Sequence, residues 1–251
     1  MTTQSLLESC FVLHTRLYRE TSLLVDFWGK ESGIVRCVAK GVRGKRSTQR
    51  VWLQPFQRVR ASWQGKRELK VLTSIEPEQD SNISLIGAHL FAGFYLNELI
   101  VRLLPTSEPH LELFEAYWHT LVLLSQATQK QSIEPSLREF ESILLQELGY
   151  ALTWSEDDQR LPINPDYQYM LAQPEFVWHR VYNSQQTGSS SFTTPLSHEL
   201  LLPGSLLLKI AIHEWDCPEV LNALKRVHRF VFHILMGGQP LRTRELFRLH
   251  S

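Results

Sequence analysis

The side chains best suited to binding chemistry are concentrated in one short stretch, KGVRGKRSTQR, at residues 40–50. Five of these residues are Lys or Arg, and none is acidic. Lys and Arg bind phosphate groups, and Gly41 and Gly44 allow the main chain to bend and to approach a ligand closely. The GxxxxGK[ST] spacing of a nucleotide-binding loop is absent. The stretch therefore predicts a loop that follows a phosphate backbone.

Further cations precede this loop in the chain. Isolated charges are too costly to bury, so we expect them on the surface or in loops, where they could bind nucleic acid. The predicted nucleic-acid-binding residues in this region are Arg16, Arg19, Arg36, Lys40, Arg43, Lys45, Arg46 and Arg50. A weaker basic patch between residues 225 and 248 adds Arg226 and Arg229.

The residue types that catalyse reactions show no comparable pattern. The HExxH and GxSxG motifs are absent, and the ten histidines are scattered. The three cysteines form no CxxC pair, which argues against a cysteine-based zinc site. Asp157 and Asp158 could bind a cation, but a solvated turn explains them better. We expect no catalytic residues, no metal and no cofactor, so the protein is predicted not to be an enzyme.

The basic residues lie on a segment that has the pattern of a small β-barrel. Short runs rich in Val, Leu, Ile and aromatic residues alternate with polar turns, and GKESG reads as a hairpin turn. Five such short strands within about 70 residues fit a closed barrel such as an OB-fold. We expect this domain to span residues 1–78, with strands at residues 11–14, 22–28, 33–39, 56–63 and 68–74.

A mainly α-helical domain is expected over residues 79–251. Apolar residues recur at helical spacing within residues 85–104, 108–128, 134–150 and 218–235. Gly149 is placed where a helix cap belongs. Residues 155–205 are an irregular loop and strand insertion, with one strand expected at 176–182. The complete chain therefore belongs to the α+β class.

Two features of these domains leave alternatives open. The aromatic residues of the barrel segment could stack on bases, but Phe56 and Trp63 are better explained as core, while Trp52 is evenly balanced. Arg138 could pair with Glu134 or Glu141 on its own helix, which the spacing favours. Alternatively, it could anchor an acidic peptide beside an apolar groove.

The neutral net charge conceals an uneven distribution. Residues 1–77 carry 14 Lys or Arg and six Asp or Glu, whereas residues 78–160 carry four and 13. A basic module beside an acidic one suggests binding to a polyanion, although the two parts could also attract each other. No signal-like N-terminus or long apolar span is present, so we expect a cytoplasmic, nucleoid-associated protein without membrane contact.

Several motifs resemble the bacterial RecO family of recombination mediators. The N-terminal series FVLHTRLYRETSLLVDFWGKESGIVRCVAKGVRGKRS, followed by LQPF, is the most specific. FYLNELIVRLL, LREFESILLQELGY and GGQPLRTRELFR follow in the same order as in the family. Leu17 departs from the pattern, since the family usually has Pro there.

The resemblance implies an N-terminal OB-fold and a helical C-terminal domain. Members of the family bind single- and double-stranded DNA and anneal complementary strands. With RecR and RecF, they load RecA onto DNA coated by single-strand-binding protein, SSB. Some relatives carry a four-cysteine zinc site, but the matching cysteines are missing in this chain. The rival hypotheses are a protein-binding adaptor with an acidic partner and a metal-dependent DNA enzyme.

The resemblance also implies a second binding site. In the family, an apolar groove in the helical domain binds the acidic, Phe-ending tail of SSB. Through its place in LREFE, Arg138 matches the cation that receives this tail. Leu121, Leu124 and Phe140 are then expected as groove walls.

Overall fold

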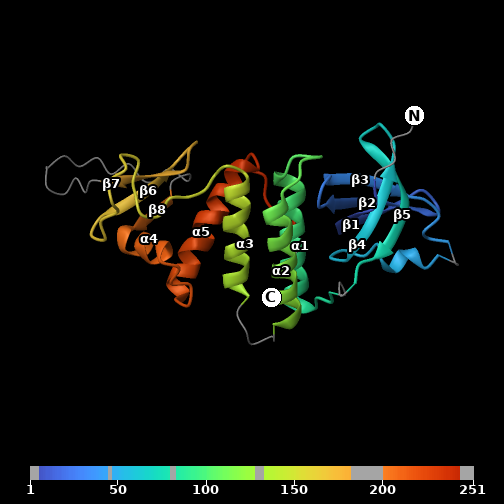
Figure 1. The fold of residues 1–251 in the computed structure, drawn as a ribbon. Helices are drawn as coiled ribbons and strands as arrows, with labels where there is room; N and C mark the ends of the chain where they lie inside the picture. Colours follow the sequence, from blue (N-terminus) through green and yellow to red (C-terminus); the bar gives the residue numbers. More distant parts are fainter. Residues whose placement is uncertain (1–5, 45–46, 80–82, 128–132, 182–199, 244–251) are drawn as a thin grey trace. The chain divides into compact units, whose positions relative to one another are not determined.

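The computed structural model describes residues 6–44, 47–79, 83–127, 133–181 and 200–243. The chain forms two compact units, residues 1–133 together with 240–251, and residues 134–239. A closed barrel comes first and helices dominate the later part, which confirms the predicted α+β class (Figure 1). Within the described residues, no helix has both the length and the apolar character needed to span a membrane.

Five strands close the barrel in the order β1-β2-β3-β5-β4. Neighbouring strands are antiparallel, except for β3 and β5, which run parallel. The register shifts between Val12 and His14 on β1, so the alternation of inward and outward side chains changes there. The elements are β1 Glu8–Tyr18, β2 Ser22–Gly29, β3 Gly33–Ala39, the short helix η1 Gln49–Val51, β4 Arg58–Gln64 and β5 Leu69–Pro77.

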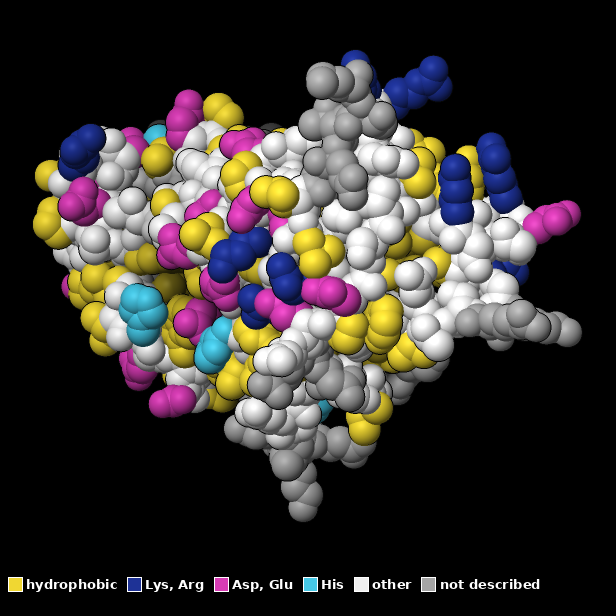
Figure 2. Space-filling model, turned by 45° about the vertical axis from the view of Figure 1, so that its right-hand side comes forward, with side chains coloured by type: hydrophobic (Ala, Val, Ile, Leu, Met, Phe, Trp, Pro, Cys, Tyr) yellow, Lys and Arg dark blue, Asp and Glu magenta, His cyan; other side chains and the backbone are white. Residues whose placement is uncertain are grey.

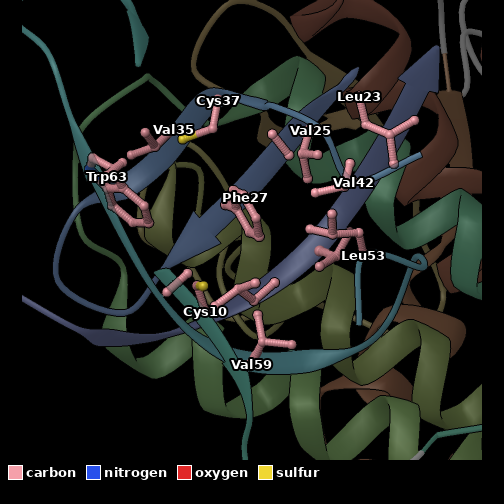
Figure 3. Packing of buried hydrophobic residues seen from close by; sticks show 14 residues of the cluster. Cys10, Leu23, Val25, Phe27, Val35, Cys37, Val42, Leu53, Val59 and Trp63 are labelled. Carbon is pink, nitrogen blue, oxygen red and sulfur yellow. The ribbon is translucent and has the colours of Figure 1, made fainter. Parts of the chain in front are cut away.

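The interior of the barrel is apolar and is filled from every strand (Figure 3). Phe27 and Trp63 stack at its centre, with 6.2 Å between the ring centroids. Trp63 is 5% exposed and belongs to this core, as expected, whereas Phe56 is 4% exposed but packs outside the barrel interior, with its ring centroid 5.0 Å from that of Phe94. Trp52 is partly buried and packs against the same cluster, which limits the surface that it could offer to a base.

Two helices of the same unit, α1 Gly87–Leu103 and α2 Leu111–Gln126, cover part of the outer face of the barrel. Phe11 and Trp28 point outward from β1 and β2, and both pack against Phe114 of α2. The amide of Asn97 on α1 donates to the carbonyl of Leu13 at 2.7 Å. This part of the outer face is therefore buried, whereas Arg16 on β1 and Arg36 on β3 are exposed.

The second unit begins with α3 Glu134–Glu147, which ends at Gly149 in the left-handed region, as the sequence predicted. A three-stranded sheet follows in the order β7-β6-β8. Its strand β7 matches the strand expected near 176–182. The remaining elements are β6 Gln168–Ala172, β7 Val177–Val181, β8 Leu200–Pro203, α4 Gly204–Ala211 and α5 Pro218–Leu235.

The barrel and the first compact unit end at different residues. The last barrel strand ends at Pro77, but α1 and α2 group with the barrel. They do so because the apolar outer face at Phe11 and Trp28 needs cover. The domain boundary expected after residue 78 remains a prediction, and it concerns only where the barrel ends.

Candidate nucleic-acid interface

The open part of the outer barrel face is organised around one acid, Asp26. Strand pairing sets His14, Asp26 and Arg36 side by side across β1, β2 and β3. Asp26 is 3% exposed and accepts hydrogen bonds from Arg36 Nε at 2.6 Å and from Arg16 Nη2 at 3.3 Å. The two Arg side chains remain about half exposed. Asp26 thus holds two guanidinium groups at the surface, with a net positive charge.

The charge states of this face follow from its geometry. Hydrogen bonding to Asp26, followed by its Coulomb attraction, raises the pKa of Arg36, which therefore stays charged. Partial burial, followed by the charge of Arg16, lowers the pKa of His14, so at neutral pH the imidazole is mostly neutral. The positive charge of the face at neutral pH therefore comes from its arginines.

The basic loop is anchored to the barrel at its N-terminal end. Val42 is buried in the core, and Gly41 has φ +72, which favours glycine. Arg43 Nη1 donates to the carbonyls of Arg19 and Glu20 at 3.1 and 2.9 Å. Arg43 therefore fixes the turn between β1 and β2, and this role occupies part of the guanidinium group that the sequence assigned to nucleic acid.

The other predicted cations of the barrel segment differ in the groups that surround them. Lys40 and Arg50 are exposed, and Arg19 is exposed with its guanidinium 5.3 Å from the ring centroid of Tyr18. Lys45 and Arg46 lie outside the described residues. Figure 2 shows Lys and Arg side chains projecting from the surface over the barrel. The exposed cations are thus available to a ligand that approaches from solvent.

The cavity that the described residues form beside these cations is small. A cavity beside the loop, lined by Lys40, Val42 and Gln49 among others, holds only about 30 Å³. This is close to the volume of one water molecule in the liquid. The geometry suits an extended chain of phosphates better than an enclosed nucleotide.

The second unit carries the other predicted cations on α5. Val220, Leu224 and Val227 are buried, whereas Arg226 and Arg229 are exposed. Their spacing of three residues puts them on one helix face.

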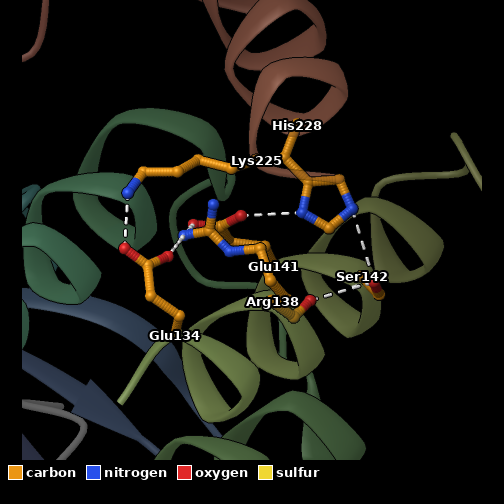
Figure 4. A network of polar contacts seen from close by, with 6 residues as sticks. All are labelled: Glu134, Arg138, Glu141, Ser142, Lys225 and His228. Carbon is orange, nitrogen blue, oxygen red and sulfur yellow. Dashed lines mark hydrogen bonds and ion pairs between the residues drawn. The ribbon is translucent and has the colours of Figure 1, made fainter. Parts of the chain in front are cut away.

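Arg138 lies in a buried polar network between α3 and α5 (Figure 4). Its Nη2 lies 2.6 Å from Glu141 and 3.9 Å from Glu134, the two acids expected from sequence. The other carboxylate oxygen of Glu141 lies 2.7 Å from Nδ1 of His228. Lys225 pairs with Glu134 from α5. The sequence had not indicated the role of His228, because it is 87 residues away from Glu141.

Arg138 also keeps hydrogen-bonding capacity. Its Nε and Nη1 are buried without a hydrogen-bond partner among the described residues. An unsatisfied buried donor costs about 1–3 kcal/mol, so an additional acceptor would be favourable. Phe140, on the same helix, is fully buried, and Leu121 and Leu124 are buried on α2 of the first unit. The groove expected from these residues remains a prediction.

Two family models match the chain. The model described as Recombination protein O N terminal matches residues 1–80, and Recombination protein O C terminal matches residues 87–244. The chain belongs to the RecO family.

Curated relatives named DNA repair protein RecO match this RecO chain over nearly its full length. The protein from Cellvibrio japonicus is 38% identical over 242 residues, 96% of each chain. The one from Idiomarina loihiensis is 37% identical over 244 residues, 96% of this chain and 97% of the relative. The one from Pseudomonas aeruginosa is 39% identical over 240 residues, 96% of this chain and 94% of the relative. The expected family is confirmed, and this RecO chain is a DNA repair protein.

Within the part of the chain that the structure describes, no group of three His, Cys, Asp or Glu side chains could hold a metal ion. Asp157 is engaged instead, since it accepts from the main-chain N–H groups of Gln159 and Leu161 and pairs with Arg180. Asp157 therefore stabilises a turn.

Proposed function

We propose that this RecO chain binds single- and double-stranded DNA through the open face of its barrel and the adjoining basic loop. The observation that carries the proposal is the pair of half-exposed guanidinium groups that Asp26 holds on the barrel. They stand in a segment, residues 1–77, with 14 basic and six acidic residues. Contacts to phosphate carry no base information, so binding is independent of sequence.

Strand annealing follows from the same charge. Two DNA strands repel each other through their phosphates, and a basic surface that holds one strand lowers this repulsion for the second. Together with RecR, the chain would then help to load RecA on single-stranded DNA coated by SSB. Family membership supports this step, and RecF takes part in the same pathway.

The salt dependence of binding to an oligo(dT) single strand tests the DNA interface. Removing a phosphate contact by Lys40→Gln, Arg36→Gln or Arg50→Gln should reduce the slope of log K against log salt by about 0.7 per contact. Lys209→Gln, the same charge change on α4, is the control and should leave the slope unchanged. Unchanged slopes in all barrel variants would refute this interface. A chain that retains no oligonucleotide even at low salt would favour the protein-binding adaptor.

The acidic, Phe-ending tail of SSB is the proposed partner of Arg138. The two buried N–H groups without a partner support this assignment, because a carboxylate would satisfy them. Phe140, on the same helix as Arg138, is the apolar residue proposed for the same tail, while Leu121 and Leu124 belong to the first unit and stay a prediction from the sequence.

Binding of a tail peptide to Arg138 variants tests this second site. Arg138→Ala leaves Glu141 with one charged partner fewer, so Arg138→Lys, which keeps the charge, is measured beside it. Both variants should bind the peptide at least about ten-fold more weakly, since each loses the paired N–H groups. A thermal melt shows whether each variant is folded. Unchanged affinity in a folded variant would remove Arg138 from the site.

A further inference from the structure

The second unit contains a cavity to which no role has been given so far, although His228 of the network around Arg138 lies in its lining. It holds about 500 Å³, within the range of sites that bind small molecules or peptide side chains. Its lining comes from α3, from the segment after α3, and from α4 and α5. The lining residues with specific chemistry are Glu139, Ser142, Trp154, His213, Trp215 and His228.

Two tryptophans supply the aromatic part of the cavity. Trp154 packs against the buried Trp178, with 5.8 Å between ring centroids, and this contact supports its ring. Trp215 lies beside His213, 5.2 Å between centroids, directly after α4 ends. The turn that holds His213 and Trp215 is tight, because the N–H of Trp215 donates to the carbonyl of His213 at 2.7 Å. Aromatic faces of this kind attract cations through the ring quadrupole.

Glu139 is the one Asp, Glu, Lys or Arg side chain among the described residues that line the cavity, which His213 and His228 also line. Glu139 is exposed and has no ion pair with any of the described residues. No Lys or Arg is among the residues that line the cavity. A carboxylate beside tryptophan rings is complementary to a guanidinium group, which stacks on aromatic faces and donates to carboxylates in pairs.

The indole of Trp215 requires a hydrogen-bond acceptor. Its Nε1 is buried and has no hydrogen-bond partner among the described residues. A buried N–H group without a partner is costly, and a carbonyl oxygen would satisfy it. One ligand that brings both a cation and a carbonyl oxygen is a peptide that contains arginine.

We propose that this cavity binds an arginine side chain from a peptide segment of a partner protein. The guanidinium group lies against Trp154 and donates to Glu139, while a main-chain carbonyl of the peptide accepts from Trp215. The acidic tail assigned to Arg138 does not fit here, because Glu139 repels carboxylates. DNA is excluded for the same reason, so this surface adds a partner of opposite charge to those already proposed.

Peptide binding to the full chain tests the proposal. The probe is fluorescein-labelled Gly-Ala-Arg-Ala-Gly, measured by anisotropy, and the matched peptide has citrulline, the neutral isostere, in place of arginine. The arginine peptide should bind at least about ten-fold more tightly, which corresponds to one charge-assisted hydrogen-bond pair. Equal affinity for the two peptides, or no binding of either at millimolar concentration, would overturn the proposal.

Three variants assign the contacts. Glu139→Gln should remove the preference for arginine over citrulline, whereas Glu175→Gln, an exposed acid in the turn between β6 and β7, should keep it. Trp215→Phe keeps an aromatic side chain and removes the indole N–H, so it should weaken the binding of both peptides equally. Trp154→Phe should reduce the arginine preference only in part. A preference that survives Glu139→Gln, or an acidic Phe-ending peptide that displaces the arginine peptide, would overturn the assignment.

Discussion

At the scale of single residues, Asp26 decides how the basic barrel face presents its charge. It accepts hydrogen bonds from Arg16 and Arg36, and it is itself almost completely buried. Two opposing effects on the proposed DNA binding follow. Asp26 orients the guanidinium groups, but its negative charge also repels phosphate.

The charge effect should be the larger one. Arg16 and Arg36 are about half exposed and stay solvated without the acid, so the orientation energy lost with Asp26 is about 0–1 kcal/mol. A unit charge close to phosphate contributes about 1–4 kcal/mol at the effective dielectric constants of a surface. A net gain of at least about 1 kcal/mol is expected, so Asp26→Asn should tighten binding to oligo(dT) by about five-fold or more at low salt, measured by anisotropy. Asp166→Asn, which removes an exposed acid from the second unit, should change it little. Weaker binding by Asp26→Asn would mean that orientation dominates.

Residue-level prediction from sequence succeeded where partners are close in the chain. Glu134 and Glu141 lie on the same helix as Arg138, so helical spacing was enough to predict both contacts. The pairing of His14, Asp26 and Arg36 depends on strand register, and the contact of Glu141 with His228 depends on packing between helices. Spacing within one element contains neither kind of information.

At the scale of elements, the turn between β2 and β3 depends on a glycine that nothing larger can replace. Gly33 has φ +64, and a Cβ there would lie 2.2 Å from the carbonyl oxygen of Glu108. Gly41 has a similar φ of +72, but a Cβ there would meet nothing within 4 Å. The two positions separate the cost of backbone conformation from the cost of crowding.

Substituting both glycines measures these costs. Gly41→Ala should reduce the free energy of unfolding by about 1–2 kcal/mol, the penalty of a left-handed conformation. Gly33→Ala should reduce it by about 2–5 kcal/mol, because overpacking against the Glu108 backbone is added. Urea denaturation of both variants gives the comparison. Equal losses would show that the backbone near Glu108 moves aside without cost.

The long periodic helices were predictable from sequence, and so were β2 and β3 of the barrel, whereas several short elements of the second unit were not. The α1, α2, α3 and α5 helices lie within the ranges that the apolar spacing indicated, since each repeats its pattern over several turns. β1 is longer than the predicted strand at 11–14, because the register shift after Val12 hides its alternation. β6 and β8 lie in the turn-rich segment and the eight-residue α4 begins at its end, and the patterns of all three are too short to recognise.

At the scale of the whole molecule, the first unit is assembled from two distant parts of the chain. Glu98 on α1 accepts hydrogen bonds from the N–H groups of Arg242 and Thr243 and from the hydroxyl of Thr243. Arg102 donates to the same carboxylate and to the carbonyl of Pro240. Glu98 therefore fastens the segment after the second unit to the first.

This attachment should depend on pH. Burial alone would raise the pKa of Glu98, but hydrogen bonds from Thr243, Arg242 and Arg102 outweigh it and lower the pKa below the usual 4.5. A lowered pKa in the folded state means that the stabilisation is complete above about pH 4.5 and is lost as the pH falls through the folded pKa. At pH 7, Glu98→Gln should be less stable by about 1–2 kcal/mol in urea denaturation.

The difference between Glu98→Gln and the unaltered chain should shrink below about pH 4.5. Glu112→Gln, an exposed acid in the first turn of α2, is a control for the general effect of acid. If the difference between the two proteins stays constant from pH 7 to pH 3, the carboxylate of Glu98 does not fasten this segment.

The hydrogen bonds of Glu98 to Arg242 and Thr243 also set the order in which the two units can be completed during synthesis. The ribosome produces the barrel, α1 and α2 first, then all of the second unit, and only then Arg242 and Thr243. The second unit, residues 134–239, can thus be complete on a nascent chain before the hydrogen-bond donors of Glu98 have been synthesised. These donors lie more than 140 residues downstream of Glu98. The part of the protein that starts folding first is the part that finishes last.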